Sequence, residues 1–62
     1  MEEKKLIRLK DVEKAVGLKK SFIYQMVKEG KFPQPFKLGP RAVAWRRDEI
    51  DGWIEGLARA KF

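Results

Sequence analysis

The chain contains no cysteine, histidine, threonine or asparagine, and its only serine is Ser21. Without cysteine, neither a disulfide bond nor a cysteine-ligated zinc site can stabilise the fold. Without histidine or cysteine, the nucleophile–base pairs built on those residues cannot be assembled. The nine acidic residues are scattered over predicted helix surfaces and the ends of the chain, so carboxylate chemistry has no evident centre. We therefore expect a protein that is not an enzyme and that holds no metal ion or cofactor.

Long hydrophobic runs are also missing. No stretch approaches the ~20 apolar residues of a membrane span, and no signal peptide is recognisable at the N-terminus. With 62 residues, the chain is expected to form a single domain over residues 1–62, in which the charged residues 1–5 are frayed. The absence of cysteine and of membrane signals is consistent with a cytoplasmic location.

The chain does carry positive charge, and most of it lies in one stretch. Its net charge is +6, but the segment from Lys19 to Arg47 has eight basic residues and one acidic residue, Glu29, which makes that segment +7. The eight basic residues are Lys19, Lys20, Lys28, Lys31, Lys37, Arg41, Arg46 and Arg47. The segment covers a predicted helix and a predicted hairpin, a combination suited to the phosphates of a nucleic-acid duplex.

Hydrophobic residues at helical spacing predict three helices. The first covers residues 10–16 and ends at Gly17, the second covers residues 19–29 and ends at Gly30, and the third runs from residue 47 to about residue 60. The apolar residues expected on their inner faces are Val12, Ala15, Val16, Ile23, Met26, Val27, Ile50, Trp53, Ile54 and Leu57. The short turn between the first two helices predicts a helix-turn-helix.

The segment between the second and third predicted helices favours strands. Residues 32–35 contain two prolines, which exclude a helix there. Residues 36–38 alternate apolar and polar as a half-buried strand does, residues 39–41 form a turn, and residues 42–46 form a second strand with Val43 and Trp45 facing inward. Residues 6–9 are expected to enter the fold as a short extended segment. The fold class is therefore mostly α with a small β-hairpin, a winged helix-turn-helix in the order helix-helix-hairpin-helix.

This fold class predicts which residues meet DNA, because the second helix of such a motif lies in the major groove. The residues expected to contact DNA from that helix are Lys19, Lys20, Ser21, Phe22, Tyr24, Gln25 and Lys28. Gln25 can pair bidentately with adenine, and Lys28 can reach guanine. The hairpin, or wing, adds Lys37, Arg41 and Arg46, which are expected to reach an adjacent backbone or minor groove.

Several of these residues have a plain structural alternative. The Tyr24 ring packs against the wing instead of, or as well as, binding phosphate, and Phe22 shields the edge of the core instead of touching DNA. Arg46 and Arg47 contact DNA or instead pair with Asp48 and its acidic neighbours. Trp45 and Trp53 are expected to be core residues.

The sequence resembles the AlpA family of prophage regulators, which are small MerR-like winged-helix proteins related to phage excisionases. The resemblance rests on the opening residues 6–10, Gly17-Leu18, Ile23-Tyr24, Lys28-Glu29-Gly30 followed by Phe32-Pro33, the wing residues 37–46 and Trp53-Ile54. It implies a double-stranded-DNA-binding regulator of a prophage or integrated element, associated with the bacterial nucleoid. The family implies transcriptional regulation of an integrase gene, excision directionality, or both, with an integrase or further copies of the chain as partners.

One departure from the family concerns the start of the second helix. The family commonly has a Ser-x-Ser-Thr run there, whereas this chain has Lys19-Lys20-Ser21-Phe22. Lys19 is a poor N-cap, and the loss of a good cap typically costs ~1 kcal/mol.

The main alternative function is a protein-interaction module that docks on an integrase or a regulatory protein, with the third helix as its surface. RNA binding is less well supported, because single-strand readers expose aromatic platforms. Binding to a membrane surface is the weakest alternative, because the apolar face of the second helix is needed for the core.

Overall fold

The computed structural model describes residues 5–60, which form three helices and three short strands. The helices are α1 (Leu9–Val16), α2 (Lys20–Lys28) and α3 (Arg47–Glu55), and the strands are β1 (Leu6–Ile7), β2 (Phe36–Gly39) and β3 (Ala42–Arg46). Of the residues expected to be frayed, 1–4 lie outside the described part of the chain. The backbone carbonyl of Lys5 accepts a hydrogen bond from the Arg47 amide at 2.7 Å, so the chain is held from residue 5 onward.

The strands form one antiparallel sheet in the order β1-β3-β2. The predicted hairpin is therefore confirmed. The segment expected to be extended, residues 6–9, contributes a third strand, β1, which pairs with the edge of β3 that β2 leaves open. Ile7 pairs with Trp45 and Lys37 pairs with Val43, so these four side chains lie on one face of the sheet. Leu6, Phe36, Ala44 and Arg46 lie on the opposite face.

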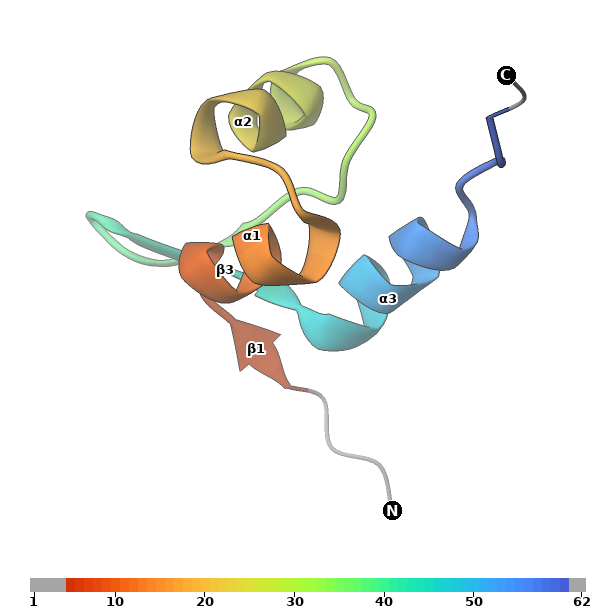
Figure 1. Cartoon of the computed structure of the whole chain (residues 1–62). Helices are drawn as coiled ribbons and strands as arrows, with labels where there is room; N and C mark the ends of the chain where they lie inside the picture. Colours follow the sequence, from red (N-terminus) through yellow and green to blue (C-terminus); the bar gives the residue numbers. More distant parts are fainter. Residues whose placement is uncertain (1–4, 61–62) are drawn as a thin grey trace.

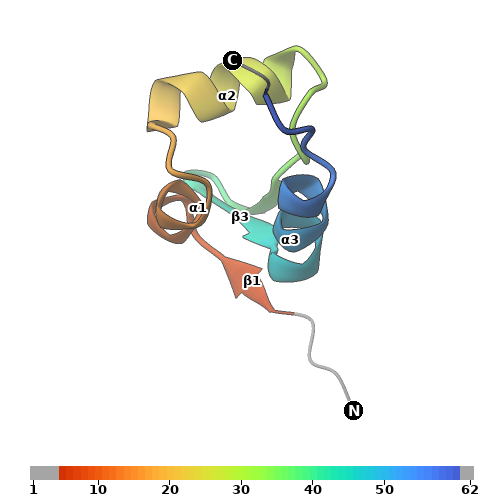
Figure 2. The ribbon, with the colours of Figure 1, turned by 45° about the vertical axis from the view of Figure 1, so that its right-hand side comes forward.

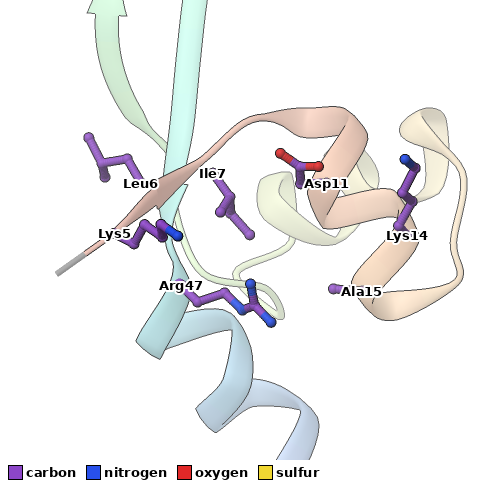
Figure 3. A pocket seen from close by; sticks show the side chains of 7 residues that line it. All are labelled: Lys5, Leu6, Ile7, Asp11, Lys14, Ala15 and Arg47. Atoms are coloured by element: carbon purple, nitrogen blue, oxygen red, sulfur yellow. The ribbon is translucent and has the colours of Figure 1, made fainter. Parts of the chain in front are cut away.

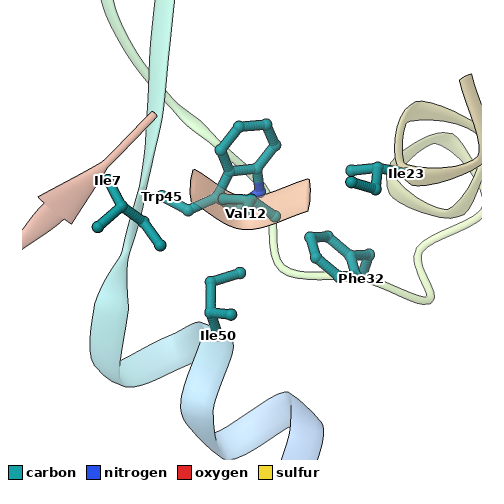
Figure 4. Close-up of a cluster of buried hydrophobic side chains, with 6 residues drawn as sticks. All are labelled: Ile7, Val12, Ile23, Phe32, Trp45 and Ile50. Carbon is teal, nitrogen blue, oxygen red and sulfur yellow. The ribbon is translucent and has the colours of Figure 1, made fainter. Parts of the chain in front are cut away.

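The core lies between the sheet and the helices and centres on Trp45 (Figure 4). Each of the three helices contributes one fully buried aliphatic residue, namely Val12, Ile23 and Ile50. Ile7 from β1 and Phe32 from the loop after α2 complete the cluster. No polar or charged side chain is buried among residues 5–60, so apolar contact supplies the core packing.

Residues 36–38 form a strand, as expected, but the expectation that this strand is half-buried is wrong. Phe36 is 45% exposed and Leu38 is 51% exposed, and Lys37 between them is exposed as well. The pairing of Phe36 with Ala44 places its side chain on the face opposite Trp45. The large buried side chains lie on the Trp45 face, and on the opposite face Ala44 of β3 is buried while the apolar residues of β2 are not.

The third helix is shorter than expected. It ends at Glu55 instead of near residue 60, and Gly56 is its C-cap rather than a mid-helix residue. The Gly56 amide donates to the carbonyls of Gly52 and Trp53 at 3.0 and 3.2 Å. Ile50 of the predicted apolar stripe is buried and Trp53 packs on the core, but Leu57 lies past the helix and is 55% exposed. Two glycines lower the helix propensity there, and no core contact beyond Trp53 compensates.

Figures 1 and 2 show how these elements are arranged. α1 and α3 flank β3, α2 lies across the top of the molecule, and the β2–β3 hairpin extends away from the helices in Figure 1. Three helices and a small antiparallel sheet within residues 5–60 are the arrangement of a small winged helix-turn-helix fold. The fold class expected from the sequence is confirmed.

Candidate nucleic-acid interface

The position of α2 is defined at its C-terminal end by a tight glycine cap. Gly30 has a φ of 76°, a left-handed conformation that glycine adopts without steric cost. The Gly30 amide donates to the Val27 carbonyl at 3.1 Å and the Lys31 amide donates to the Met26 carbonyl at 2.8 Å. This pair of hydrogen bonds is a Schellman motif, which ends the helix cleanly and turns the chain toward the wing.

At its N-terminal end, α2 begins without a side-chain cap. Lys19 is the N-cap residue in an extended conformation, and its side chain makes no capping hydrogen bond. No acidic residue lies in the first turn. Lys19, Lys20 and Phe22 are all exposed at this end, and half of the Phe22 side chain is accessible to solvent. This helix terminus therefore combines the positive end of the helix dipole with two lysines.

The outward face of α2 contains a shallow depression of about 640 Å³. It is lined by Ser21, Tyr24, Gln25, Lys28 and Glu29. The structure thus brings four of the predicted contact residues together on one surface. Glu29 is the member that the sequence analysis did not select, although it stands out as the only acid of the basic segment.

Tyr24 belongs both to this surface and to the support beneath it. Its ring centroid lies 6.2 Å from that of Trp45, and the side chain remains 38% exposed. The ring therefore rests on β3 of the wing, as the structural alternative expected. The same contact places α2 on the Trp45 side of the sheet, which is also the side of Lys37.

The three predicted wing residues do not lie together. Lys37 lies on the face of the sheet shared with Trp45, and Arg41 is exposed in the turn between β2 and β3. Arg46 lies on the opposite face and donates two hydrogen bonds to Asp48, at 2.7 Å from Nη2 and 3.2 Å from Nε. The hydrogen bonds to Asp48 raise the pKa of Arg46 above its ordinary value. Arg46 thus braces the start of α3.

Acidic partners divide the eight cations of the basic segment into two groups. Lys31, Arg46 and Arg47 pair with Glu29, Asp48 and Asp51 at 3.7, 2.7 and 3.4 Å. The other five form no ion pair within residues 5–60. These five are Lys19, Lys20, Lys28, Lys37 and Arg41. All of them belong to α2, its N-cap or the wing, which leaves that part of the surface available to an anionic partner.

The loop between α2 and the wing is anchored by side-chain hydrogen bonds. The Trp45 indole donates to the Pro33 carbonyl at 2.8 Å, and the Trp53 indole donates to the Lys31 carbonyl at 2.9 Å. Phe32 packs edge-on against both indoles, with centroid distances of 6.4 and 4.7 Å. Gln34 donates back to the Val27 carbonyl of α2 at 2.9 Å. These contacts set the spacing between helix and wing, a role that the sequence patterns did not indicate.

A second depression, of about 480 Å³, lies apart from this surface between β1, α1 and the start of α3 (Figure 3). Lys5, Lys14 and Arg47 contribute positive charge to its lining, and Asp11 contributes negative charge. No residue of α2 or of the β2–β3 hairpin lines it, so it is a separate feature of the surface.

Residues 5–60 contain neither a candidate metal site nor a candidate membrane-spanning helix. No group of three or more histidine, cysteine or acidic side chains in this part of the chain lies close enough to hold a metal ion. Nor is any helix in it long and apolar enough to cross a membrane.

A winged helix-turn-helix with a basic face on its second helix and wing defines a class of small DNA-binding domains. Residues 5–59 match the family described as "Prophage CP4-57 regulatory protein (AlpA)". The chain therefore belongs to the AlpA family of prophage regulatory proteins, a regulatory DNA-binding family rather than a family of enzymes. The resemblance noted in the sequence is confirmed.

A similar protein is known from Enterobacteria phage P4, where it is described as "Uncharacterized protein ORF88". The two are 33% identical over 54 residues, which cover 87% of this chain and 61% of the phage protein. The chain thus spans about three-fifths of that relative's length.

Proposed function

We propose that this chain binds double-stranded DNA in a sequence-dependent manner, with α2 in the major groove and the wing on the neighbouring backbone or minor groove. The observation that carries this proposal is the distribution of unpaired charge. All five cations of the basic segment that lack an acidic partner within residues 5–60 lie on α2, its N-cap or the wing. Phosphate contacts from such residues position a protein on a duplex, and groove contacts from α2 supply sequence preference.

The chain then acts as a regulator of a prophage or integrated element. Family membership and the phage P4 relative support this role. Two activities fit it: regulation of integrase transcription, and direction of recombination toward excision. Double-stranded DNA is the primary partner, and an integrase or further copies of the chain on adjacent sites are secondary ones. A place on the nucleoid in the bacterial cytoplasm follows from DNA binding.

The experiment that tests this role is a nuclease footprint of the purified chain. The probes are duplexes that tile the attachment region and the integrase promoter of the element that encodes it. Protection at the promoter alone identifies a transcriptional regulator, and protection of arrayed sites in the attachment arm identifies an excision factor. If neither region is protected at low salt while a scrambled duplex binds equally well, sequence-dependent binding is refuted.

A second candidate function is docking on another protein, an integrase or a regulator, and one observation favours it. Ile54 in the last turn of α3 and Leu57 just beyond its end are large apolar side chains exposed to solvent. A variant with alanine at Lys20, Lys28 and Arg41 separates the two functions. Retention of the element's integrase by this variant, together with loss of duplex binding, supports docking independent of DNA.

A further inference from the structure

Glu29 is the only acidic residue between Lys19 and Arg47, and it lines the depression on the outward face of α2. Electrostatics opposes a carboxylate at this position in two ways. Glu29 is the C-cap residue of α2, where the helix dipole disfavours negative charge, and DNA phosphates would repel it. A residue that conflicts with its local surroundings in this manner points to a specific role.

The contacts of Glu29 indicate that role. Its Oε2 accepts a hydrogen bond from Gln25 Nε2 at 3.2 Å, one helical turn earlier on the same face. Its Oε1 lies 3.7 Å from the Lys31 ammonium. Gln25 on the candidate interface is thus joined through the Glu29 carboxylate to the Lys31 ammonium.

The far end of this chain of contacts is a lysine whose side chain is exposed and whose backbone is fixed to the fold. The Lys31 amide donates to the Met26 carbonyl at 2.8 Å, and the Lys31 carbonyl accepts from the Trp53 indole at 2.9 Å. The backbone that carries Lys31 is therefore held by both α2 and α3. Glu29 itself sits inside the same Schellman motif, so its own backbone is positioned equally well.

This arrangement determines the orientation of the Gln25 carboxamide. An ionised carboxylate only accepts hydrogen bonds, so the nitrogen of Gln25 must face Glu29 and the oxygen must face away. One amide hydrogen is engaged by Glu29. The oxygen and the second hydrogen remain available to a ligand on the outward side.

These two remaining groups match adenine and not guanine. The major-groove edge of adenine offers an acceptor at N7 and a donor at N6, which one amide hydrogen and the amide oxygen satisfy together. Guanine offers two acceptors, N7 and O6, and would need a second donor in place of the amide oxygen. With one hydrogen committed to Glu29, Gln25 cannot supply both donors.

We propose that Glu29, held by Lys31, is a positioning residue that restricts Gln25 to reading adenine. The proposal rests on the proposed DNA-binding function and deepens it, because it assigns a base preference to one position of the site. It also accounts for the single acid in the basic segment.

The test compares base preferences of the wild-type chain with those of Glu29→Ala, Gln25→Ala and the double variant, selected from a randomised duplex library. The position read by Gln25 is the one whose preference disappears in Gln25→Ala. At that position the wild type is expected to prefer adenine over guanine by about tenfold, as one bidentate pair provides. Glu29→Ala is expected to reduce this adenine-to-guanine ratio to below about threefold. In the double variant, where Gln25 is already alanine, the Glu29→Ala substitution is expected to leave the ratio unchanged. Glu55→Ala, which removes the same charge from the last residue of α3, is the matched control.

A purely electrostatic role for Glu29 gives a different result. In that case Glu29→Ala strengthens binding to every duplex by the same factor and leaves the adenine preference intact, which overturns the proposal. If the wild type selects a site but Gln25→Ala alters no position of it, DNA binding stands and the positioning role falls. If the wild type selects no sequence at all, the proposed function and the positioning role both fall.

A readout in the free protein does not depend on DNA. The NMR signals of the Gln25 side-chain amide protons are expected to shift in Glu29→Ala and, to a smaller extent, in Lys31→Met. They are expected to stay unchanged in Glu55→Ala. Identical Gln25 side-chain signals in the wild type and Glu29→Ala would refute the hydrogen bond on which the proposal depends.

Discussion

Trp45 connects more parts of the molecule than its single position suggests. Its ring is fully buried and contacts Tyr24 of α2 and Phe32 of the following loop. Its indole N–H donates a hydrogen bond to the Pro33 carbonyl. The same side chain therefore fills the core and supports the candidate interface. An effect on DNA binding at this position cannot be separated from an effect on folding.

Trp45→Ala is expected to destabilise the fold by roughly 3–5 kcal/mol, because it leaves a cavity under α2. Native domains typically have a total stability of about 5–15 kcal/mol, so this loss removes a large share of it. Urea denaturation followed by circular dichroism measures the loss. Trp45→Phe is the milder comparison, since it keeps an aromatic ring but loses the indole donor to Pro33 and part of the buried volume, and it is expected to destabilise the fold less than Trp45→Ala does. A Trp45→Ala variant with wild-type stability would show that the core is not organised around this residue.

Lys28 and Arg41 test the interface at the level of single residues, because both are exposed and neither is paired within residues 5–60. Lys28→Ala and Arg41→Ala are each expected to weaken duplex binding without changing the unfolding midpoint. The reason is the loss of a phosphate or base contact with no loss of packing. Fluorescence anisotropy on the footprinted duplex measures the affinity. Lys14→Ala removes an equal charge from the separate depression and is expected to bind as the wild type does. Equal weakening by all three substitutions would mean that only net charge matters.

At the scale of whole elements, each of the three described helices begins after a basic residue that makes no capping hydrogen bond. These N-cap residues are Arg8, Lys19 and Arg46. Good N-caps carry a side-chain oxygen, so the helix starts are weaker than they need to be. For α2 the weak start coincides with the candidate interface, where a phosphate can replace the missing acceptor.

Lys19→Ser is therefore expected to stabilise the fold by about 1 kcal/mol and at the same time to weaken duplex binding. Chemical denaturation measures the first change, and anisotropy titration measures the second. A gain in stability together with a loss of duplex affinity would indicate that Lys19 contacts DNA at the expense of a good N-cap. If Lys19→Ser stabilises the protein and binds DNA as tightly as the wild type, Lys19 is a poor cap without a compensating role.

Glycines in and after the helices have opposite expected effects on substitution. Gly52 lies within α3, and apart from its chain neighbours and its own helix backbone no atom of residues 5–60 lies within 4 Å of the space that a Cβ would occupy, whereas Gly30 has a positive φ of 76°. Gly52→Ala is expected to stabilise the fold by about 1 kcal/mol, since alanine is the better helix former. Gly30→Ala is expected to destabilise it by about 1–2 kcal/mol, since a side chain strains the left-handed conformation. Thermal unfolding of both variants measures the contrast. Destabilisation by Gly52→Ala would contradict this expectation, because it would mean that a side chain at this position of α3 meets a steric obstacle.

At the scale of the whole molecule, the five cations of the basic segment that are unpaired within residues 5–60 predict how binding responds to salt. If each neutralises one phosphate, the logarithm of the affinity should fall against the logarithm of the salt concentration with a slope near −4.5. Titrations between about 50 and 200 mM salt measure this slope. A variant that lacks both Lys28 and Arg41 should show a slope shallower by about 2. A slope near zero for the wild type would exclude the phosphate footprint altogether.

Much of the fold was predictable because local signals agreed with one another. Gly17 and Gly30 end α1 and α2 where the sequence indicated, both with positive φ. The turn before Ala42 and the inward position of Trp45 were also predicted correctly. The end of α3 was not, because helical periodicity continues past Gly56 while the core that would support it does not.

The candidate interface was predicted less completely. Periodicity indicated the outward face of α2, but it treated Glu29 as background and placed Arg46 with the wing cations. Whether a charged side chain is available depends on which neighbour its head group reaches. The sequence analysis offered the pairing of Arg46 with Asp48 only as an alternative to DNA contact, and it did not indicate the contact of Glu29 with Gln25. Both contacts depend on side-chain conformations that periodicity does not specify.

The sequence by itself determined the class of fold, the stretch of basic charge and the residues on the outer side of α2. Hydrophobic spacing, glycine and proline positions and charge are local properties, so the order of residues is enough to show them. Only the tertiary structure decided which cations remain unpaired, which face of β2 meets the core, and how far the wing stands from α2. Those features depend on contacts between residues distant in the chain, such as Trp53 with Lys31 and Trp45 with Pro33, and no local pattern records them.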